Sequence, residues 1–118
     1  MAVDHTNSRS AQLAHPLNPA ILRLIKVTID HAHLAGKLVG LFGELAGDPL
    51  AAPILYGLDL DEFSMSPSRI PIIKEVMRHI RRNACQKLSK GALACANAEE
   101  VMEHYRLFLK GLGLENYY

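Results

Sequence analysis

The sequence has no excess of charge of one sign and no long apolar run. Its 118 residues carry thirteen basic and twelve acidic side chains, a net charge of +1, which gives no support for binding to nucleic acid or to a membrane surface. No stretch approaches the length of uninterrupted apolar sequence, about 18 residues, that a membrane-spanning helix needs. The polar residues from Met1 to Ser10 contain no apolar segment of a signal peptide. We therefore expect a cytoplasmic protein without a membrane partner.

Cysteines are scarce as well, and two of them make no disulfide framework. Cys85 and Cys95 are ten residues apart in sequence typical of a helix, and a continuous helix keeps their thiols out of reach of each other. We expect both thiols to be reduced, as in a reducing cytoplasm. A metal-ligand pattern is missing too, because His31 and His33 are two residues apart on a predicted helix and face roughly 200° apart.

The chain is too short for a complete (β/α)8 barrel, which needs about 200 or more residues. With 118 residues, of which 49% are apolar and 21% charged, it is typical of one globular domain with a single core.

Apolar periodicity and helix signals predict alternating helices and strands. Asn18 and Pro19 provide an N-cap and a first-turn proline, and an apolar stripe follows up to a C-cap at Gly36. The last predicted helix opens with a capping box, Asn97 and Glu100. The other expected elements are a strand buried on both faces over 38–42, a short helix from Asp48 and Pro49 to Gly57, a strand centred on 60–65, and helices over 71–82, 84–94 and 98–109.

This order of elements predicts an α/β fold with parallel strands joined by right-handed crossovers. Within one domain we expect a loop over residues 1–17, βα units over 18–82 and packing helices over 83–118. Two parallel strands do not make a sheet that is stable alone, because both edges and both faces need cover.

Two sequence strings carry most of the information about function. They are GELAGDP, from Gly43 to Pro49, and LDEFSMSP, from Leu60 to Pro67. At this separation they closely resemble the end of the phosphoenolpyruvate-binding barrel of enzyme I, the phosphoenolpyruvate–protein phosphotransferase of the bacterial sugar phosphotransferase system. The resemblance extends upstream to Ala2 and, more loosely, downstream to the end of the chain. It implies a partial TIM barrel, two parallel strands with flanking helices from the last βα units, followed by C-terminal helices.

The resemblance also implies an activity that this chain carries only in part. In the family, phosphoenolpyruvate bound with Mg²⁺ phosphorylates a histidine on a separate mobile domain. The family's metal-binding carboxylates, its threonine-asparagine-aspartate phosphate motif and its phosphohistidine domain all precede the region that begins at Met1. We therefore expect no metal ligands and no cofactor in this chain alone.

Two positions with chemical roles in the family are changed. His5 stands where the family has an arginine that binds the substrate phosphate, and an imidazole lacks the arginine's fixed fork of charged donors. Phe42 stands where the family has the cysteine that protonates the enolate, and a phenyl ring has no transferable proton. General acid catalysis contributes about 10² to 10⁴ in rate, so this second change is the more severe. We interpret His5 as a solvated loop histidine and Phe42 as a core aromatic.

Glu44, at the end of the first predicted strand, is the remaining candidate for a catalytic carboxylate, because the carboxyl ends of barrel strands form the active-site face. A structural interpretation competes with it, in which the acid ties its loop to Gly47 by a hydrogen bond. Asp61 and Glu62 are adjacent on a strand and point to opposite faces, so we interpret them as structural. The basic run over 78–82 is interpreted as a solvated helix end.

We interpret the chain as a C-terminal fragment of an enzyme I-like barrel that is inactive on its own. Two alternatives remain open. In the first, the chain is an oligomerisation or regulatory module that binds full-length enzyme I. In the second, it is one half of a split enzyme whose other chain supplies the missing motifs. Because strand edges and apolar helix stripes need cover, we expect a homo-oligomer, a complex with a barrel-completing or full-length enzyme I chain, or a poorly ordered monomer.

Overall fold

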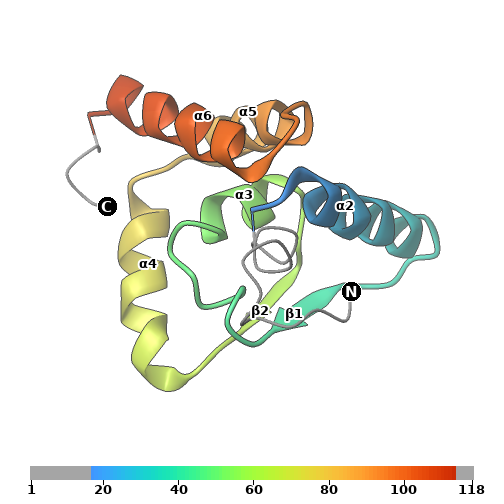
Figure 1. Ribbon diagram of the computed structural model, residues 1–118. Helices are drawn as coiled ribbons and strands as arrows, with labels where there is room; N and C mark the ends of the chain where they lie inside the picture. Colours follow the sequence, from blue (N-terminus) through green and yellow to red (C-terminus); the bar gives the residue numbers. More distant parts are fainter. Residues whose placement is uncertain (1–16, 114–118) are drawn as a thin grey trace, which may run out of the picture.

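Residues 17–113 are described by the computed structural model, in which two short strands lie at one edge of a group of helices (Figure 1). Within these residues, no helix combines the length and the apolar character needed to cross a membrane. In chain order the elements are α2 (Pro19–Leu34), β1 (Gly40–Phe42), α3 (Ala52–Gly57), β2 (Glu62–Ser64), the 3-10 helix η1 (Pro67–Arg69), α4 (Ile70–Arg78), α5 (Arg82–Leu93) and α6 (Ala98–Gly111).

The first described helix, α2, forms where the sequence predicts it. The side chain of Asn18 accepts a hydrogen bond from the backbone N–H of Ala20 at 2.9 Å, and Pro19 occupies the first turn, where an N–H has no helical partner. Gly36 follows the helix end with a φ of +72°, a left-handed conformation that glycine adopts without strain. The prediction of a helix between Asn18 and Gly36 is confirmed.

β1 and β2 pair in parallel, which confirms the predicted strand orientation. The register places Gly40 opposite Glu62 and Phe42 opposite Ser64, and in the described part of the chain the sheet has these two strands only. The expectation that the first strand is buried on both faces is wrong. Leu41 packs against the core, but Gly40 and Phe42 on the other face are exposed, because no described element covers that face.

The short helix α3 begins later than its sequence signals predict. The carboxylate of Asp48 accepts a hydrogen bond from the backbone N–H of Leu50 at 2.9 Å, so Asp48 and Pro49 open a turn. α3 itself starts at Ala52 and ends at Gly57, the predicted end. The turn and α3 together carry the chain away from the end of β1.

The helix predicted over 71–82 ends earlier than expected, and the helix predicted over 84–94 begins earlier. α4 ends at Arg78, and α5 begins at Arg82 after a short break. The interpretation of the basic run as one helix end is therefore corrected, since Arg82 is at a helix start. Its guanidinium donates to the carboxylate of Asp59 at 2.9 Å and lies 5.6 Å from the centre of the Tyr56 ring, contacts that fix the start of α5.

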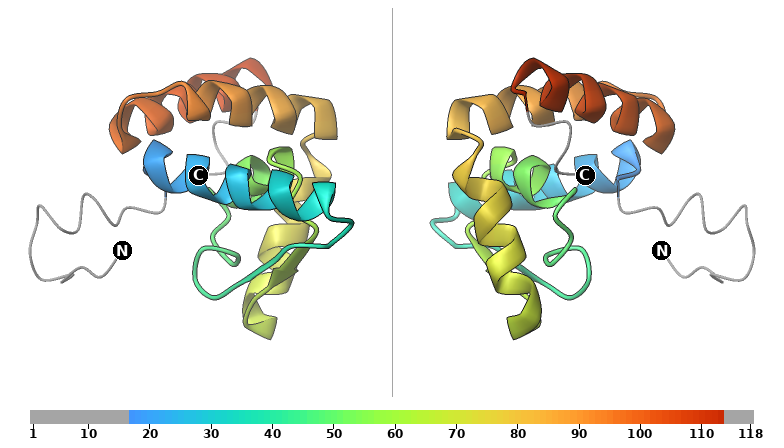
Figure 2. Two further views of the ribbon diagram at one scale, coloured as in Figure 1. Left: turned by 90° about the vertical axis from the view of Figure 1, so that its right-hand side faces the viewer. Right: turned by 90° about the vertical axis from the view of Figure 1, so that its left-hand side faces the viewer.

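The core lies between the helices, and α5 and α6 form a layer over α2 and α3 (Figure 2). α3 and α5 pack closely at Gly57, and the buried hydroxyl of Ser89 donates to the carbonyl of Ile54 at 2.6 Å. The largest fully buried side chains come from several of these helices and their connections: Leu17, Leu22, Ile29, Ile54, Leu55, Leu58, Leu88, Val101 and Tyr105.

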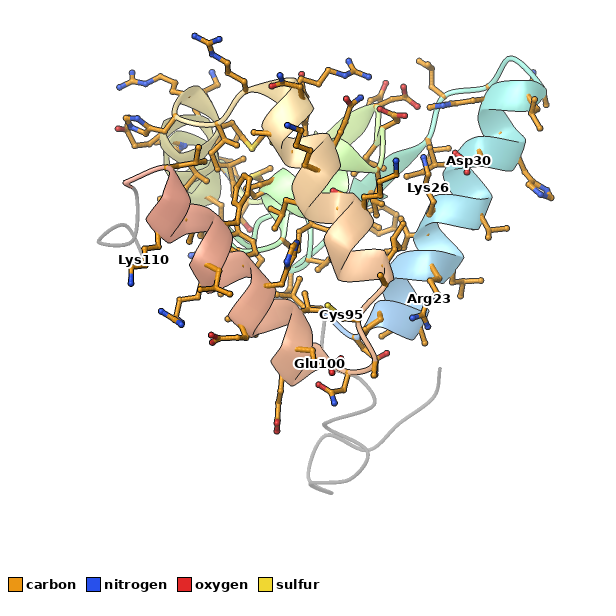
Figure 3. The ribbon with its side chains drawn as sticks, turned by 90° about the horizontal axis from the view of Figure 1, so that it is seen from above. Arg23, Lys26, Asp30, Cys95, Glu100 and Lys110 are labelled. Atoms are coloured by element: carbon orange, nitrogen blue, oxygen red, sulfur yellow. The ribbon has the colours of Figure 1, made fainter. Side chains whose placement is uncertain are left out.

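The junction of α2, α5 and α6 is held by polar contacts. Arg23 of α2 donates through Nε to the carbonyl of Leu93 at 3.0 Å and through Nη2 to the carbonyl of Cys95 at 2.9 Å (Figure 3). The carbonyl of Leu93 ends α5, where a cation also complements the helix dipole, and Cys95 lies in the link to α6. Asn97 caps α6 by accepting from the N–H of Glu100 at 2.8 Å, which confirms the predicted cap.

Candidate functional site

A pocket of about 880 Å³ lies at the carboxyl ends of β1 and β2 and opens to solvent. In parallel sheets this end of the strands is where ligands bind, because the loops that follow neighbouring strands surround one space. Residues from β1, β2 and the segments that follow them line it: Phe42, Gly43, Glu44, Gly47, Asp48, Ser64, Met65, Ser66 and Arg69.

Two glycines shape the wall of the pocket that follows β1. Gly43 has a φ of +104°, which side chains other than glycine rarely adopt, and its N–H extends the sheet by donating to the carbonyl of Ser64 at 3.2 Å. Gly47 lies close under the segment after β2, where an added Cβ would be 3.3 Å from Cβ of Met65. The loop between the two glycines therefore turns sharply and packs tightly beside the pocket.

Phe42 is exposed at the pocket, with 83% of its surface open to solvent, so its interpretation as a core aromatic is wrong. It shares a strand face with Gly40 and is paired with Ser64 of β2. Leu41 and Phe63, which point to the other face, pack against the core. Phe42 therefore offers a ligand apolar contact and no transferable proton.

Glu44 lines the pocket with an exposed side chain. Its backbone carbonyl accepts a hydrogen bond from the N–H of Gly47 at 3.2 Å. The expected link between these two residues is thus made by the backbone and not by the carboxylate. The carboxylate remains as an anionic group on the pocket wall.

Arg69 is a pocket residue that the sequence analysis did not identify. Its Nε donates to the carbonyl of Gly47 at 3.0 Å, which joins η1 to the loop after β1. It is the only cationic side chain that the described residues contribute to the pocket lining. The sequence feature that could have identified Arg69 is its position shortly after the end of a parallel strand, where side chains face the ligand-binding edge.

His5, the other changed position, lies outside the described residues. In the described part of the chain, no group of three or more histidine, cysteine, aspartate or glutamate side chains is arranged to hold a metal ion.

Asp61 stabilises the amino ends of the strands, away from the pocket. Its carboxylate accepts a hydrogen bond from the N–H of Val39 at 2.8 Å, and Nε2 of His33 lies 2.7 Å from the same oxygen. The hydrogen bond to His33, followed by that from Val39, lowers the pKa of Asp61. The contact ties the end of α2 to the sheet, which is a structural role.

Neither cysteine contributes to the pocket. Both are free, as expected. Cys85 is buried in the core, and burial raises the pKa of its thiol to about 11. Burial, and then the carboxylate of Glu100, raise the pKa of Cys95. A thiol that stays protonated at neutral pH is a poor nucleophile, which argues against thiolate chemistry at either position.

Similarity to known proteins covers most of the chain. Residues 1–82 match the family described as PEP-utilising enzyme, PEP-binding domain. The chain is 45% identical over 103 residues to the phosphoenolpyruvate-protein phosphotransferase of Staphylococcus carnosus and 47% identical over 103 residues to that of Listeria monocytogenes, in each case covering 87% of this chain and 18% of the relative. It is 42% identical over 100 residues to multiphosphoryl transfer protein 1 of Escherichia coli, covering 85% of this chain and 12% of that protein. The chain thus spans less than a fifth of the length of these relatives.

Proposed function

The chain belongs to the family of PEP-utilising enzymes, and from this premise we propose that it forms the last part of the (β/α)8 barrel of an enzyme I-type phosphoenolpyruvate–protein phosphotransferase. In this assignment β1 and β2 are neighbouring barrel strands, α3 and α4 are the helices that follow them, and α5 and α6 are the C-terminal helices. The observation that carries the proposal is the pocket at the carboxyl ends of the two parallel strands, since active sites of such barrels lie at that end.

We assign the pocket to phosphoenolpyruvate as one wall of its binding site. Glu44 and Phe42, which end β1 and begin the loop after it, line this wall. The relatives' names attach phosphoenolpyruvate to proteins whose sequences are close to this one over the same segment. The remaining walls of the site belong to the preceding strands of the barrel, which the resemblance places before residue 1.

We propose that the chain alone does not transfer phosphoryl groups. The phosphate motif, the metal-binding carboxylates and the phosphohistidine domain that the resemblance implies are not in its sequence. Phe42 cannot protonate an enolate, which removes a contribution of about 10² to 10⁴ in rate. His5 in place of arginine loses hydrogen bonds between charged groups, each worth about 1.5 to 3 kcal/mol.

The described pocket residues do not form a complete site for the Mg²⁺ that the resemblance implies. Mg²⁺ takes oxygen ligands in octahedral geometry and is bound through one or two carboxylates together with substrate phosphate. Of the two carboxylates here, Asp48 is engaged by the N–H of Leu50, which leaves Glu44 as the single uncommitted acid on the described lining. We propose that the metal ligands lie in preceding parts of the barrel.

We propose that other strands complete the sheet, from a second copy or from a barrel-completing chain. Each of β1 and β2 has one strand neighbour among the described residues. Large apolar side chains are exposed nearby, including Leu34 at 88% and Leu38 at 72%. Unpaired strand edges and exposed apolar side chains are both typical of surfaces that associate. A regulatory module that binds full-length enzyme I would use the same surfaces and would differ in its partner.

The isolated chain provides the first test. Purified chain is incubated with radiolabelled phosphoenolpyruvate and Mg²⁺, and labelled histidine and released pyruvate are measured. We expect neither, for the unchanged chain and for the double variant His5→Arg, Phe42→Cys, because the variant restores two positions but not the missing motifs. Label on a histidine of the isolated chain would overturn its proposed inactivity.

The second test supplies the rest of the barrel. The Staphylococcus carnosus phosphotransferase, shortened by the segment that matches this chain, is mixed with it, and size-exclusion chromatography with light scattering measures association. We expect the unchanged chain and the double variant His5→Arg, Phe42→Cys each to form a complex with the shortened phosphotransferase. The complex with the double variant should release pyruvate at least about 10² faster than the complex with the unchanged chain. A compact monomer that binds nothing would contradict the barrel-completing role, and binding to the full-length phosphotransferase alone would favour the regulatory module.

A further inference from the structure

Arg69 gives the pocket a positive charge that the proposed function does not use. We infer that its guanidinium binds the phosphate or carboxylate oxygens of an anionic ligand at the carboxyl ends of β1 and β2. The inference rests on the proposed function for the identity of the natural ligand, phosphoenolpyruvate. The binding of a phosphate group by Arg69 requires no turnover and is testable separately.

Arg69 is held at its side chain and at its backbone. Its Nε donates to the carbonyl of Gly47 at 3.0 Å, and its own backbone N–H donates to the carbonyl of Ser66 at 2.9 Å. Its stem covers Gly47 so closely that an added Cβ there would be 3.4 Å from Cγ of Arg69. These contacts engage one of the three guanidinium nitrogens and restrict where the other two lie.

A guanidinium fixed through Nε presents its two terminal amino groups as a fork. A fork of this kind matches two oxygens of a phosphate or carboxylate, and each bond gains strength because both partners are charged. Less conformational freedom is lost on binding when the side chain is already held in place. The hydroxyls of Ser64 and Ser66 line the same pocket and provide further donors to an anion.

Acidic side chains also line the pocket, and they should affect phosphate binding in the opposite direction to Arg69. Asp48 is engaged in its turn, whereas the carboxylate of Glu44 is exposed on the pocket wall. A bound phosphate experiences attraction from Arg69 and repulsion from Glu44. Removing the first charge should therefore weaken phosphate binding, and removing the second should strengthen it.

The test titrates the chain with inorganic phosphate at constant ionic strength and follows the backbone amide NMR signals of Gly43 and Gly47. We expect a saturable shift in the unchanged chain, a Kd at least about tenfold higher for Arg69→Gln, and a lower Kd for Glu44→Gln. Lys74→Gln is the matched control, because Lys74 is an exposed cation on α4 outside the pocket lining, and its Kd should not change. Arg69→Lys keeps the charge without the fork and should fall between the unchanged chain and Arg69→Gln.

The inference is overturned if the unchanged chain shows no saturable shift, if Arg69→Gln keeps the original Kd, or if Lys74→Gln loses as much affinity. Arg69→Gln could disturb the loop before phosphate is added, which its NMR signals would show. In that case Glu44→Gln and Arg69→Lys test the inference: Glu44→Gln must have a lower Kd for phosphate than the unchanged chain, and the Kd of Arg69→Lys must lie between those of the unchanged chain and Arg69→Gln. Competition by phosphoenolpyruvate separates the two proposals. Phosphate binding through Arg69 without competition counts against the proposed function alone, and phosphoenolpyruvate binding that ignores Arg69→Gln counts against this inference alone.

Discussion

Replacing Gly57 by alanine tests the contact on which the core depends, the crossing of α3 and α5. An added Cβ at Gly57 would lie 2.1 Å from the carbonyl oxygen of Cys85 and 2.2 Å from Oγ of Ser89. Both distances are far inside van der Waals contact, and the first involves a backbone atom that moves only with its helix. Overpacking of this kind costs about 1 to 3 kcal/mol.

The same substitution also disturbs a buried hydrogen bond. The hydroxyl of Ser89 donates to the carbonyl of Ile54 at 2.6 Å, and moving it away from the new methyl group weakens that bond by about 1 kcal/mol. Alanine gains up to about 1 kcal/mol over glycine in helix propensity, which offsets part of the loss. We expect Gly57→Ala to lower the free energy of unfolding by about 1 to 3 kcal/mol, a large share of the stability of a small domain.

Urea unfolding followed by far-ultraviolet circular dichroism measures this difference, and the Tm should fall by on the order of 10 °C. Gly111→Ala is the control, because Gly111 is also helical and an added Cβ there meets no atom within 4 Å. That variant should be unchanged or more stable by up to about 1 kcal/mol. Equal stability of Gly57→Ala and the unchanged chain would refute the close crossing of α3 and α5.

Two further predictions concern ionisable groups. Hydrogen bonds from His33 and Val39 lower the pKa of Asp61 in the folded chain, so its ionisation stabilises the fold above the unfolded pKa near 4, and this contribution is lost as the pH falls through the folded value. The stability difference between the unchanged chain and Asp61→Asn, from urea titrations over roughly pH 6 to pH 2, should therefore shrink toward acid, and a constant difference would contradict the assignment. Because burial raises the pKa of Cys85 to about 11, its thiol should react with iodoacetamide more slowly than the half-buried Cys95 in the native chain and equally fast in urea. Peptide mass spectrometry measures both rates, and faster native labelling of Cys85 would contradict its burial.

The helix ends that the sequence predicted well are those fixed by local chemistry. Asn18 and Asn97 accept hydrogen bonds from N–H groups two or three residues away, and Gly36 adopts a left-handed conformation directly after α2. Each of these signals involves only neighbouring residues. A single sequence therefore carries them without knowledge of the tertiary structure.

The break between α4 and α5 has no comparable local signal. The residues from Arg78 to Arg82 include neither glycine nor proline, and the apolar pattern continues across them. The start of α5 is instead fixed by Arg82, which reaches Asp59 and Tyr56 more than twenty residues earlier in the chain. Contacts between distant segments decide this boundary, so the sequence pattern predicted two helices but placed the boundary between them after residue 82 instead of after Arg78.

Of the residues that line the pocket, the sequence identified Glu44 as a candidate but not Arg69. Glu44 was identified because it ends a predicted strand, and the structure places it in the pocket lining. Arg69 reaches the same pocket only because the parallel register brings the segment after β2 beside the loop after β1, where its Nε meets the carbonyl of Gly47. The closeness of these two segments depends on how β1 and β2 pair. Sequence patterns that predict each strand separately do not define this pairing.

The exposure of Phe42 follows from which face of the sheet residues 17–113 cover. Alternate residues of a strand point to opposite faces, and the helices of this chain pack against the face that carries Leu41 and Phe63. The apolar run predicted a strand buried on both faces, but the described residues cover one face only. Burying a phenyl ring contributes about 2 to 3 kcal/mol, too little by itself to hold two chains together. We therefore propose that association with a barrel-completing chain uses the strand edges and apolar side chains such as Leu34 and Leu38, and that it would add the missing walls of the pocket.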